Sequence, residues 1–282
     1  SQWRDASGPR VIEARVGLSH EQNVALHKRM GQAVAQHVAD ELVAQVSLGW
    51  SHVIGQGVGG AVSSVDAVLL HGWLGERADW GEVARALAGQ GISTLCVDLP
   101  GHGGSQTDAV GPWEAAAFFS LPACTAALAD LLDRLKISDV VLGGYSLGGR
   151  IALSFAAQHP SRARGVVAIS SHPGLGSAGE RCQRWDADRA LSKRLTSEAL
   201  DTFLSAWYAA PLWAGMAERC PKAYKNMLSK RMRSSSKLAA MSLLGMSLGR
   251  QPDLWSVAVG GDFWYVHGAL DQKFARLGET IA

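Results

Sequence analysis

From Asp66 onward, short apolar runs alternate with longer segments whose apolar residues recur at helical spacing. Runs of strand length that are apolar throughout are typical of strands buried on both faces, as in a parallel sheet covered by helices. The alternation therefore predicts repeated strand–helix–strand units. Strands are predicted within 66–72, 92–98, 139–144, 165–170 and 263–268, and helices within 79–89, 124–135 and 147–158.

The rhythm changes after Pro173. Between Gly174 and about Ser236 the segments have helical spacing, are rich in Trp and Arg, and include no clear strand. The strand expected at 263–268 then resumes the sheet. The stretch 174–236 is therefore predicted to form a helical cap over the sheet.

Residues 1–65 follow a different pattern. An early strand and an amphipathic helix are predicted first, and 49–65 are rich in Gly and Ser, which is typical of a linker. The linker contains a G-x-G-x-x-G pattern, but a predicted strand follows it, whereas a dinucleotide site needs the start of a helix there. We therefore expect three parts: a tail at 1–48, the linker at 49–65 and one domain at 66–282.

Composition narrows the function classes. The chain has 282 residues and 47% of them are hydrophobic, which is enough for one or two domains with a buried core. A net charge of +2 argues against bulk binding to nucleic acid or anionic membrane, and no apolar run reaches the ~18 residues of a membrane span. The four cysteines form no C-x-x-C pair, so we expect reduced thiols, no metal and no cofactor. The first ten residues have no signal-peptide core, so we expect a protein that is not secreted.

The segment "GYSLG" carries the first candidate chemistry. It places Ser146 between glycines, directly after a predicted strand and before a predicted helix. A plain turn would fit this pattern, but so does a nucleophile elbow, whose strained serine stands at the carboxyl end of the sheet. The amide N–H of Leu147, at the start of the helix, and that of Trp73, after "LLHG", could form an oxyanion hole. A glycine-rich loop, "VDLPGHGGS", follows the second strand, and the three signals in this order favour the nucleophile.

A catalytic triad also needs an acid and then a histidine. Asp271 follows the strand at 263–268, in a loop suited to the acid, although an aspartate there could instead cap a helix. No histidine follows Asp271 in the sequence. We interpret His267 as a scaffold residue of the strand, and His71, His102 and His172 as residues that shape loops.

Basic side chains surround these segments. Arg150 lies one helical turn after Ser146, so it can project toward the same pocket. Other basic residues gather at the two ends of the predicted cap, where a solvated basic face is the alternative. Several guanidinium groups near one serine suggest a substrate with several carboxylates, because arginine binds carboxylate bidentately. The cap residues are Arg181, Arg184, Arg189, Lys230, Arg231 and Arg233.

Seven segments together resemble the 2-succinyl-6-hydroxy-2,4-cyclohexadiene-1-carboxylate synthases, a family of menaquinone and phylloquinone biosynthesis. The resemblance covers about 66–282, and its segments at 171–175 and 181–189 are much more specific than the elbow, which many esterases share. The segments are "LHGWLG", "VDLPGHGGS", "GGYSLGGRIAL", "SSHPGLGSAGERCQRWDADR", "FLSAWYAAPLW", "LAAMSLLGMSLGRQPDLW" and "GALDQKF".

The resemblance implies an α/β-hydrolase fold, with a mostly parallel sheet and a helical cap. It also implies a lyase that eliminates pyruvate from 2-succinyl-5-enolpyruvyl-6-hydroxy-3-cyclohexene-1-carboxylate. In that family's pattern Ser146 would be the base-like catalytic serine and Asp271 the triad acid, with oxyanion-hole N–H groups from Trp73 and Leu147. The substrate would contact Tyr145, Arg150, Arg184, Trp207 and Lys273, and either Arg231 or Lys230 would supply a further carboxylate contact.

The sequence departs from the family pattern after Asp271. The family's histidine follows the acid, on the loop after one more strand. We therefore expect a C-terminally truncated domain that lacks this histidine, the last strand and the last helix. Such a chain would leave the edge of the strand at 263–268 unpaired and would be impaired as an enzyme.

The segment at 9–35 resembles the C-terminal end of a different family. This is the thiamine-diphosphate-dependent 2-succinyl-5-enolpyruvyl-6-hydroxy-3-cyclohexene-1-carboxylate synthase, which acts one step earlier. We therefore expect a fragment of a fused protein, with other modules of the pathway in the same polypeptide and the thiamine site upstream. The location would be the plastid stroma in a eukaryote and the cytoplasm in a bacterium.

Two other interpretations stay open at this point. The first is an ordinary carboxylester hydrolase of the same fold, against which the arginine-rich segment at 181–189 argues. The second is a truncated chain without activity.

Overall fold

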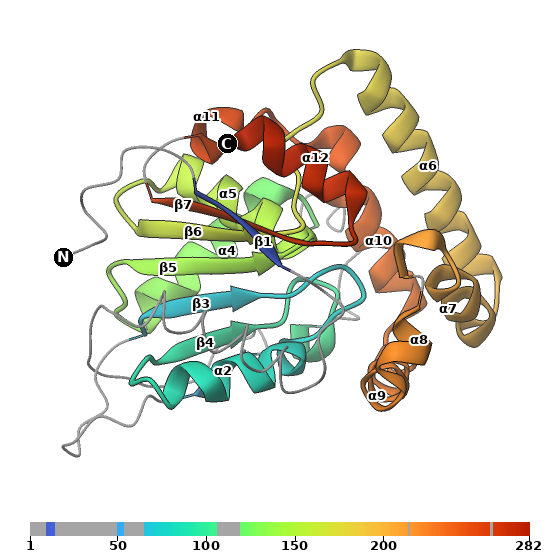
Figure 1. Ribbon diagram of the computed structural model, residues 1–282, viewed down its shortest axis with the longest axis horizontal. Helices are drawn as coiled ribbons and strands as arrows, with labels where there is room; N and C mark the ends of the chain where they lie inside the picture. The colour runs from blue at the N-terminus through green and yellow to red at the C-terminus, as the bar shows by residue number, and fades with distance from the viewer. Residues whose placement is uncertain (1–9, 15–49, 54–64, 106–118, 214, 260–261) are drawn as a thin grey trace.

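The computed structural model describes residues 10–14, 50–53, 65–105, 119–213, 215–259 and 262–282. In this part of the chain seven strands form one sheet, with the order β1-β7-β6-β5-β3-β4-β2 (Figure 1). Neighbouring strands run parallel except β2, which is antiparallel to β4. The strands are β1 (Arg10–Ala14), β2 (Trp50–Val53), β3 (Ala67–Leu70), β4 (Thr94–Val97), β5 (Val140–Tyr145), β6 (Ala163–Ile169) and β7 (Phe263–Gly268).

Helices cover both faces of the sheet because successive side chains of a strand point to opposite faces. On β3, Val68 and Leu70 belong to the main core, into which α4 (Leu121–Arg134) and α5 (Leu147–Gln158) pack. Leu69 points the other way and packs against α2 (Gly81–Ala88), which the short 3-10 helix η1 (Arg77–Trp80) precedes. The strand–helix alternation predicted from the sequence is thus confirmed. The remaining sheet helix, α12 (Gln272–Ile281), follows β7.

In the sequence, a group of helices lies between β6 and β7, and α6 to α9 lie beyond the carboxyl ends of the strands (Figure 1). A serine–glutamate capping box at Ser177 and Glu180 begins the longest of them, α6, which packs against α10 and η4. The described residues of the region expected as a cap, 174–236, therefore form helices and no strand. The elements are α6 (Ala178–Ser197), α7 (Leu200–Tyr208), η3 (Pro211–Trp213), α8 (Met216–Arg219), α9 (Pro221–Arg231), α10 (Ser236–Gly245), η4 (Leu248–Arg250) and α11 (Trp255–Ala258).

Two short strands correct what was expected of the first 65 residues. Residues 50–53, expected as the start of a flexible linker, form β2 along the free edge of β4, and Trp50 packs against the main core. Residues 10–14 form the predicted early strand and pair with β7, so the β7 edge expected to be unpaired is occupied. Both corrections have one cause, because an open strand edge presents backbone groups that gain from pairing. The glycine pattern at 55–60 and the segment 15–49 lie outside the described residues, and the division at 48 and 65 stays a prediction.

No helix among the described residues combines the length and the apolar character needed to cross a membrane.

Candidate active site

Ser146 occupies a strained bend between β5 and α5. Its φ of 51° and ψ of −107° lie where non-glycine residues are rare. Its N–H donates to the carbonyl oxygen of Ile169 in β6 over 2.8 Å, which fixes the bend to the neighbouring strand. The bend is as tight as the glycines suggest, since a Cβ at Gly144 would overlap the backbone of Gly148. The nucleophile-elbow geometry predicted from "GYSLG" is therefore present.

The start of α5 lies against the loop that follows β3. A Cβ on Gly148 would overlap the carbonyl oxygen of Leu70, so only glycine allows this approach. The N–H of Leu147 belongs to the first turn of α5, where a helix leaves its amides without intrahelical partners and carries partial positive charge. Trp73 lies in the facing loop, and its indole N–H donates to the carbonyl oxygen of Ala239 in α10 over 2.9 Å. The two predicted oxyanion donors thus come from adjacent segments.

Two buried histidines brace the Trp73 loop. Nε2 of His71 accepts from the amide of Leu99 at 3.0 Å, and Nε2 of His102 accepts from the amide of Leu74 at 3.2 Å. The Nδ1 atom of each ring faces a carbonyl oxygen, of Gly72 and Pro100 respectively, so both rings are neutral with the proton on Nδ1. Burial lowers the pKa of His71 to about 4 and that of His102 to about 3. The prediction that they shape loops fits these contacts.

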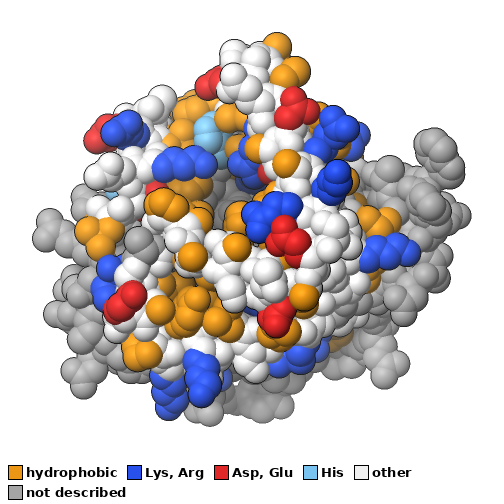
Figure 2. Space-filling model, turned by 90° about the vertical axis from the view of Figure 1, so that its right-hand side faces the viewer, with side chains coloured by type: hydrophobic (Ala, Val, Ile, Leu, Met, Phe, Trp, Pro, Cys, Tyr) orange, Lys and Arg blue, Asp and Glu red, His pale blue; other side chains and the backbone are white. Residues whose placement is uncertain are grey.

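A cavity of about 450 Å³ opens beside Ser146. Figure 2 shows the hollow on this face of the molecule, with Lys and Arg side chains around it among hydrophobic ones. Its apolar lining includes Trp73, Trp207 and Trp213, which pack edge-on or tilted in a shared aromatic cluster. The cavity brings together most of the predicted site residues: Trp73, Tyr145, Ser146, Leu147, Arg150, Arg184, Trp207, Asp271 and Lys273.

The cations of the cavity are partly buried. Arg150 is 8% exposed, and burial together with the neighbouring Arg184 lowers its pKa to about 9. Its Nη2 donates to the carbonyl oxygen of Met246, whereas its Nη1 has no hydrogen-bond partner among the described residues. Burial and Arg184 also lower the pKa of Lys273 below its ordinary value. Buried cations that repel one another favour the binding of an anion between them.

Tyr145 and Asp271 line the same cavity as the serine. Burial raises the pKa of Tyr145 to about 12, so its hydroxyl stays protonated and can donate a hydrogen bond. Asp271 is the N-cap of α12, where its Oδ1 accepts from the amide of Phe274 at 3.2 Å. The capping alternative is therefore realised. The acid role stays a prediction, supported by the place of Asp271 in the cavity lining.

The histidines do not supply an evident proton acceptor for Ser146. Of those whose side chains the structure describes, His172 is the one that lines the cavity. Its Nδ1 accepts from the amide of Gly174 at 3.1 Å, so in the neutral ring the proton is on Nε2, which is then a donor. His267 is buried in β7 and lies outside the cavity lining, as a scaffold residue would. His20, His27 and His37 lie outside the described residues, and the side chain of His52 is not described either.

Arg231 and Lys230 are engaged elsewhere. Nη2 of Arg231 donates to Oδ2 of Asp79 at 2.6 Å, and Nζ of Lys230 lies 3.2 Å from Oδ1 of the same carboxylate. Burial alone would raise the pKa of Asp79, but Arg231 outweighs it and holds that pKa below its ordinary value. A third pair joins Arg233 to Glu76 at 3.0 Å. Neither of the two predicted carboxylate contacts is among the cavity-lining residues. The end of α9 is instead tied to η1 and to Glu76 just before it.

Asp188 and Ser171 are among the polar residues of the cavity that sequence reasoning missed. Asp188 lines it and pairs with Arg184, and the spacing of four residues on a predicted helix was a usable signal. Ser171 also lines it, and its hydroxyl donates to the carbonyl oxygen of Ser146. This second contact joins two loops that are adjacent only in the folded sheet, so no local pattern signals it.

Comparison with known proteins confirms the fold class. The family described as the alpha/beta hydrolase fold matches residues 68–245. The solved MenH from S. aureus superposes with a TM-score of 0.73 at 23% identity, over 83% of this chain and 84% of that one. A thermophilic esterase from Thermogutta terrifontis gives 0.66 at 20% identity, over 87% and 86%. At these identities both structures support the fold alone. A strained serine between strand and helix, beneath helices that cover a mostly parallel sheet, defines an α/β-hydrolase-fold protein.

Proteins with similar sequences identify one family within the α/β-hydrolase fold. The chain is 35% identical over 217 residues to the 2-succinyl-6-hydroxy-2,4-cyclohexadiene-1-carboxylate synthase of Escherichia coli O1:K1 / APEC, covering 76% of this chain and 81% of that protein. The synthase of Enterobacter sp. (strain 638) is 35% identical over 216 residues, with 76% and 79% covered. The chain belongs to this synthase family, whose members are lyases of the α/β-hydrolase superfamily. The resemblance stated from the sequence motifs is thereby confirmed.

Proposed function

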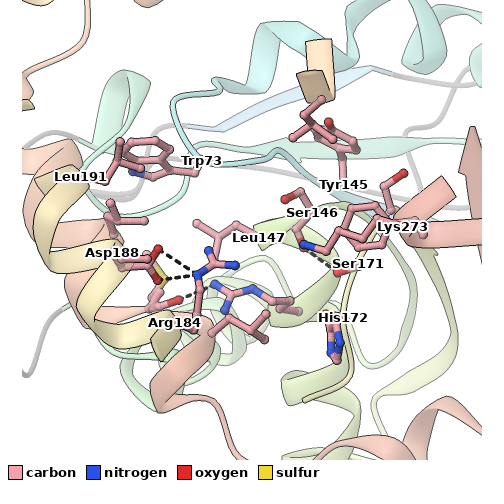
Figure 3. A pocket seen from close by; sticks show the side chains of 18 of the residues that line it. Trp73, Tyr145, Ser146, Leu147, Ser171, His172, Arg184, Asp188, Leu191 and Lys273 are labelled. Atoms are coloured by element: carbon pink, nitrogen blue, oxygen red, sulfur yellow. Dashed lines mark hydrogen bonds and ion pairs between the residues drawn. The ribbon is translucent and has the colours of Figure 1, made fainter. Parts of the chain in front are cut away.

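We propose that this protein eliminates pyruvate from 2-succinyl-5-enolpyruvyl-6-hydroxy-3-cyclohexene-1-carboxylate and releases 2-succinyl-6-hydroxy-2,4-cyclohexadiene-1-carboxylate, in menaquinone or phylloquinone biosynthesis. The observation that carries the proposal is the juxtaposition of a strained serine with three cations in one cavity. Ser146 faces the same hollow as Arg150, Arg184 and Lys273. Figure 3 shows Ser146, Tyr145 and Lys273 across the cavity from Arg184.

The reaction is a proton removal coupled to the loss of a leaving group. In the proposal, a base first takes the hydroxyl proton of Ser146, and the resulting alkoxide removes a proton from a ring carbon. The electron pair of that C–H bond forms a ring double bond, the existing ring double bond shifts, and the bond between the ring and the enolpyruvyl oxygen breaks. The protonated base then gives its proton to the departing enolate. Pyruvate then leaves after its enolate is protonated, so the atoms balance without a redox partner. Negative charge develops on the substrate during this step, and N–H donors of Trp73 and Leu147 stabilise it.

The remaining residues hold a substrate with several carboxylates. Arg150 offers its free Nη1, and Arg184 and Lys273 add charge from the other sides of the cavity. Tyr145 donates a hydrogen bond, and Trp207 packs against the substrate ring. Arg231 or Lys230 stays proposed as a further carboxylate contact, which either side chain could make only by leaving Asp79.

A serine hydroxyl needs an acceptor for its own proton. We propose that this acceptor is a histidine outside the side chains that the structure describes, and that Asp271 stabilises it as the triad acid. The assignment is supported by the tautomer of His172, which presents a donor. We also propose that the protein is a module of a fused pathway protein, on the resemblance of residues 9–35 alone.

Pyruvate release from the purified protein tests the proposal. Lactate dehydrogenase and NADH report pyruvate continuously, and Ser146→Ala should lower the rate by at least 10³-fold with unchanged circular dichroism. A rate within tenfold of the wild-type rate would reject the role of Ser146. A wild-type protein that releases no pyruvate but hydrolyses p-nitrophenyl butyrate in a Ser146-dependent manner would favour the esterase alternative. Absence of both activities would favour an inactive chain.

A further inference from the structure

Asp188 is a buried carboxylate that holds one arginine of the cavity. Nε of Arg184 lies 2.9 Å from both carboxylate oxygens of Asp188, one turn further along α6 (Figure 3). Asp188 is 3% exposed, and the hydroxyl of Ser247 donates to its Oδ2 over 2.7 Å. The carboxylate is thus held from two sides, by its own helix and by the turn before η4.

The same turn holds the other arginine. Met246, the residue before Ser247, accepts a hydrogen bond from Nη2 of Arg150 through its carbonyl oxygen. Met246 thus contacts the guanidinium of Arg150 in α5 directly, and Ser247 holds that of Arg184 in α6 through Asp188. Met246 and Ser247 are both 1% exposed, so neither can move without repacking the cap.

Charge explains why the arrangement needs a carboxylate. Arg150 and Arg184 repel one another across the cavity, and without an anion the repulsion would drive them apart. Asp188 offsets this repulsion and engages Arg184 only through Nε. Among the described residues the terminal nitrogens of Arg184 have no hydrogen-bond partner, so their N–H groups stay available to a ligand.

We propose that Asp188 and Ser247 are positioning residues that set the separation of Arg150 and Arg184, so that the cavity selects a ligand with two carboxylates on one small ring over a ligand with one. The inference rests on the proposed function for the identity of the natural substrate. It does not rest on that function for the binding preference itself, which can be measured without turnover.

The test compares two variants with a matched control. Asp188→Asn removes the charge, and Ser247→Ala removes the hydroxyl but keeps every charge. The control, Ser192→Ala, removes a serine bond from α6 to the carbonyl of Ala240 in α10, away from the cavity lining. Calorimetric titration with phthalate and with benzoate measures the preference for two carboxylates, and pyruvate release gives KM and kcat.

We expect the wild type and Ser192→Ala to bind phthalate at least tenfold more tightly than benzoate. Asp188→Asn should lose most of this preference, and Ser247→Ala should lose about half of it on a logarithmic scale. In both variants we expect KM above the wild-type value and kcat within about threefold of it. A merely structural role would weaken both probes equally and lower Tm. Equal loss for the two probes, or a wild type without a preference for phthalate, overturns the inference. If the preference follows this pattern but the wild type releases no pyruvate, the proposed function fails and the inference stands.

Discussion

The hydroxyl of Ser171 donates a hydrogen bond to the backbone carbonyl of Ser146 over 2.6 Å and joins the loops that leave β5 and β6. Ser146 has a φ of 51° and Ser170, just before Ser171, has a φ of 45°. A non-glycine residue in such a conformation costs on the order of 1–3 kcal/mol, so two adjacent strained bends need bonds that hold them. The Ser171 bond is one of these, because it fixes the peptide plane on the C-terminal side of Ser146.

Removal of this bond should slow turnover more than it weakens binding. We expect Ser171→Ala to lower kcat by about tenfold through a misplaced Ser146 hydroxyl, with KM nearly unchanged. The control is Ser154→Ala, which loses a similar bond to Gln158 within α5. Steady-state pyruvate release measures both variants. Equal kcat values for Ser171→Ala and Ser154→Ala would show that the bond has no part in turnover.

Arg150 should contribute to substrate binding through its fork of donors. Arg150→Lys keeps the charge but loses bidentate geometry, and we expect KM to rise at least tenfold, or about 1.4 kcal/mol of binding free energy. Arg134→Lys, at an exposed pair with Asp130, is the control and should leave KM unchanged. An Arg150→Lys variant with the wild-type KM would contradict the assignment.

The ion pair between Asp79 and Arg231 should stabilise the attachment of α9 to η1. Asp79→Asn removes the negative charge that pairs with the buried Arg231 but keeps a hydrogen-bond acceptor. We expect a loss of about 2 kcal/mol in the free energy of unfolding. Arg233→Met breaks the more exposed pair with Glu76 and should cost less than about 0.5 kcal/mol. Urea titration compares the two. Equal losses would mean that burial does not distinguish these pairs.

Stability should depend on pH through His71 and His102. Their pKa values in the folded protein, about 4 and about 3, lie below the ordinary value of 6.5. Between these values and pH 6.5 the unfolded chain therefore binds protons that the folded protein does not bind. The free energy of unfolding is therefore unaffected by these rings above about pH 6.5 and falls as pH decreases toward 4. The charged neighbours Asp98, Asp79 and Arg231 modulate this effect without changing its sign.

Urea titration at pH 7.5, 6.0 and 5.0 measures the dependence. Each proton that only the unfolded chain binds adds roughly 1.4 kcal/mol per pH unit to the slope of the unfolding free energy against pH. His102→Gln keeps an acceptor near the amide of Leu74 but cannot take the proton, so its slope should be shallower than that of the wild type. A variant and a wild type with the same slope below pH 6.5 would exclude His102 as the cause.

The parts that sequence reasoning predicted well depend on local patterns. The elbow at Ser146 follows from glycines that allow one close approach, and the strand at 67–70 follows from four consecutive buried apolar residues. The place of Arg150 follows from helical periodicity alone. Such features need no knowledge of the distant chain, which is why the fold class and most of the cavity could be predicted.

The parts that it missed depend on partners distant in sequence. Arg231 pairs with Asp79, 152 positions earlier, and no local pattern signals this pairing, whereas its contact with the substrate stays a prediction. Trp50 was expected in a linker because Gly and Ser follow it, but the open edge of β4 recruits its segment as a strand. The sequence around Arg231 does not indicate Asp79, and the sequence around Trp50 does not indicate β4, because both partners are distant in the chain.

The pairing of β1 with β7 sets the earliest moment during synthesis at which this edge of the sheet can form. Arg10–Ala14 is translated before its partner Phe263–Gly268, and most of the described domain lies between the two strands in the sequence. At roughly 5–20 residues per second, the first strand waits on the order of ten seconds or more before its partner exists. During that interval the unpaired backbone of this segment is exposed to other nascent chains and to chaperones. Nascent-chain pull-downs at successive lengths should therefore show chaperone occupancy of the N-terminal segment that ends only after β7 has emerged.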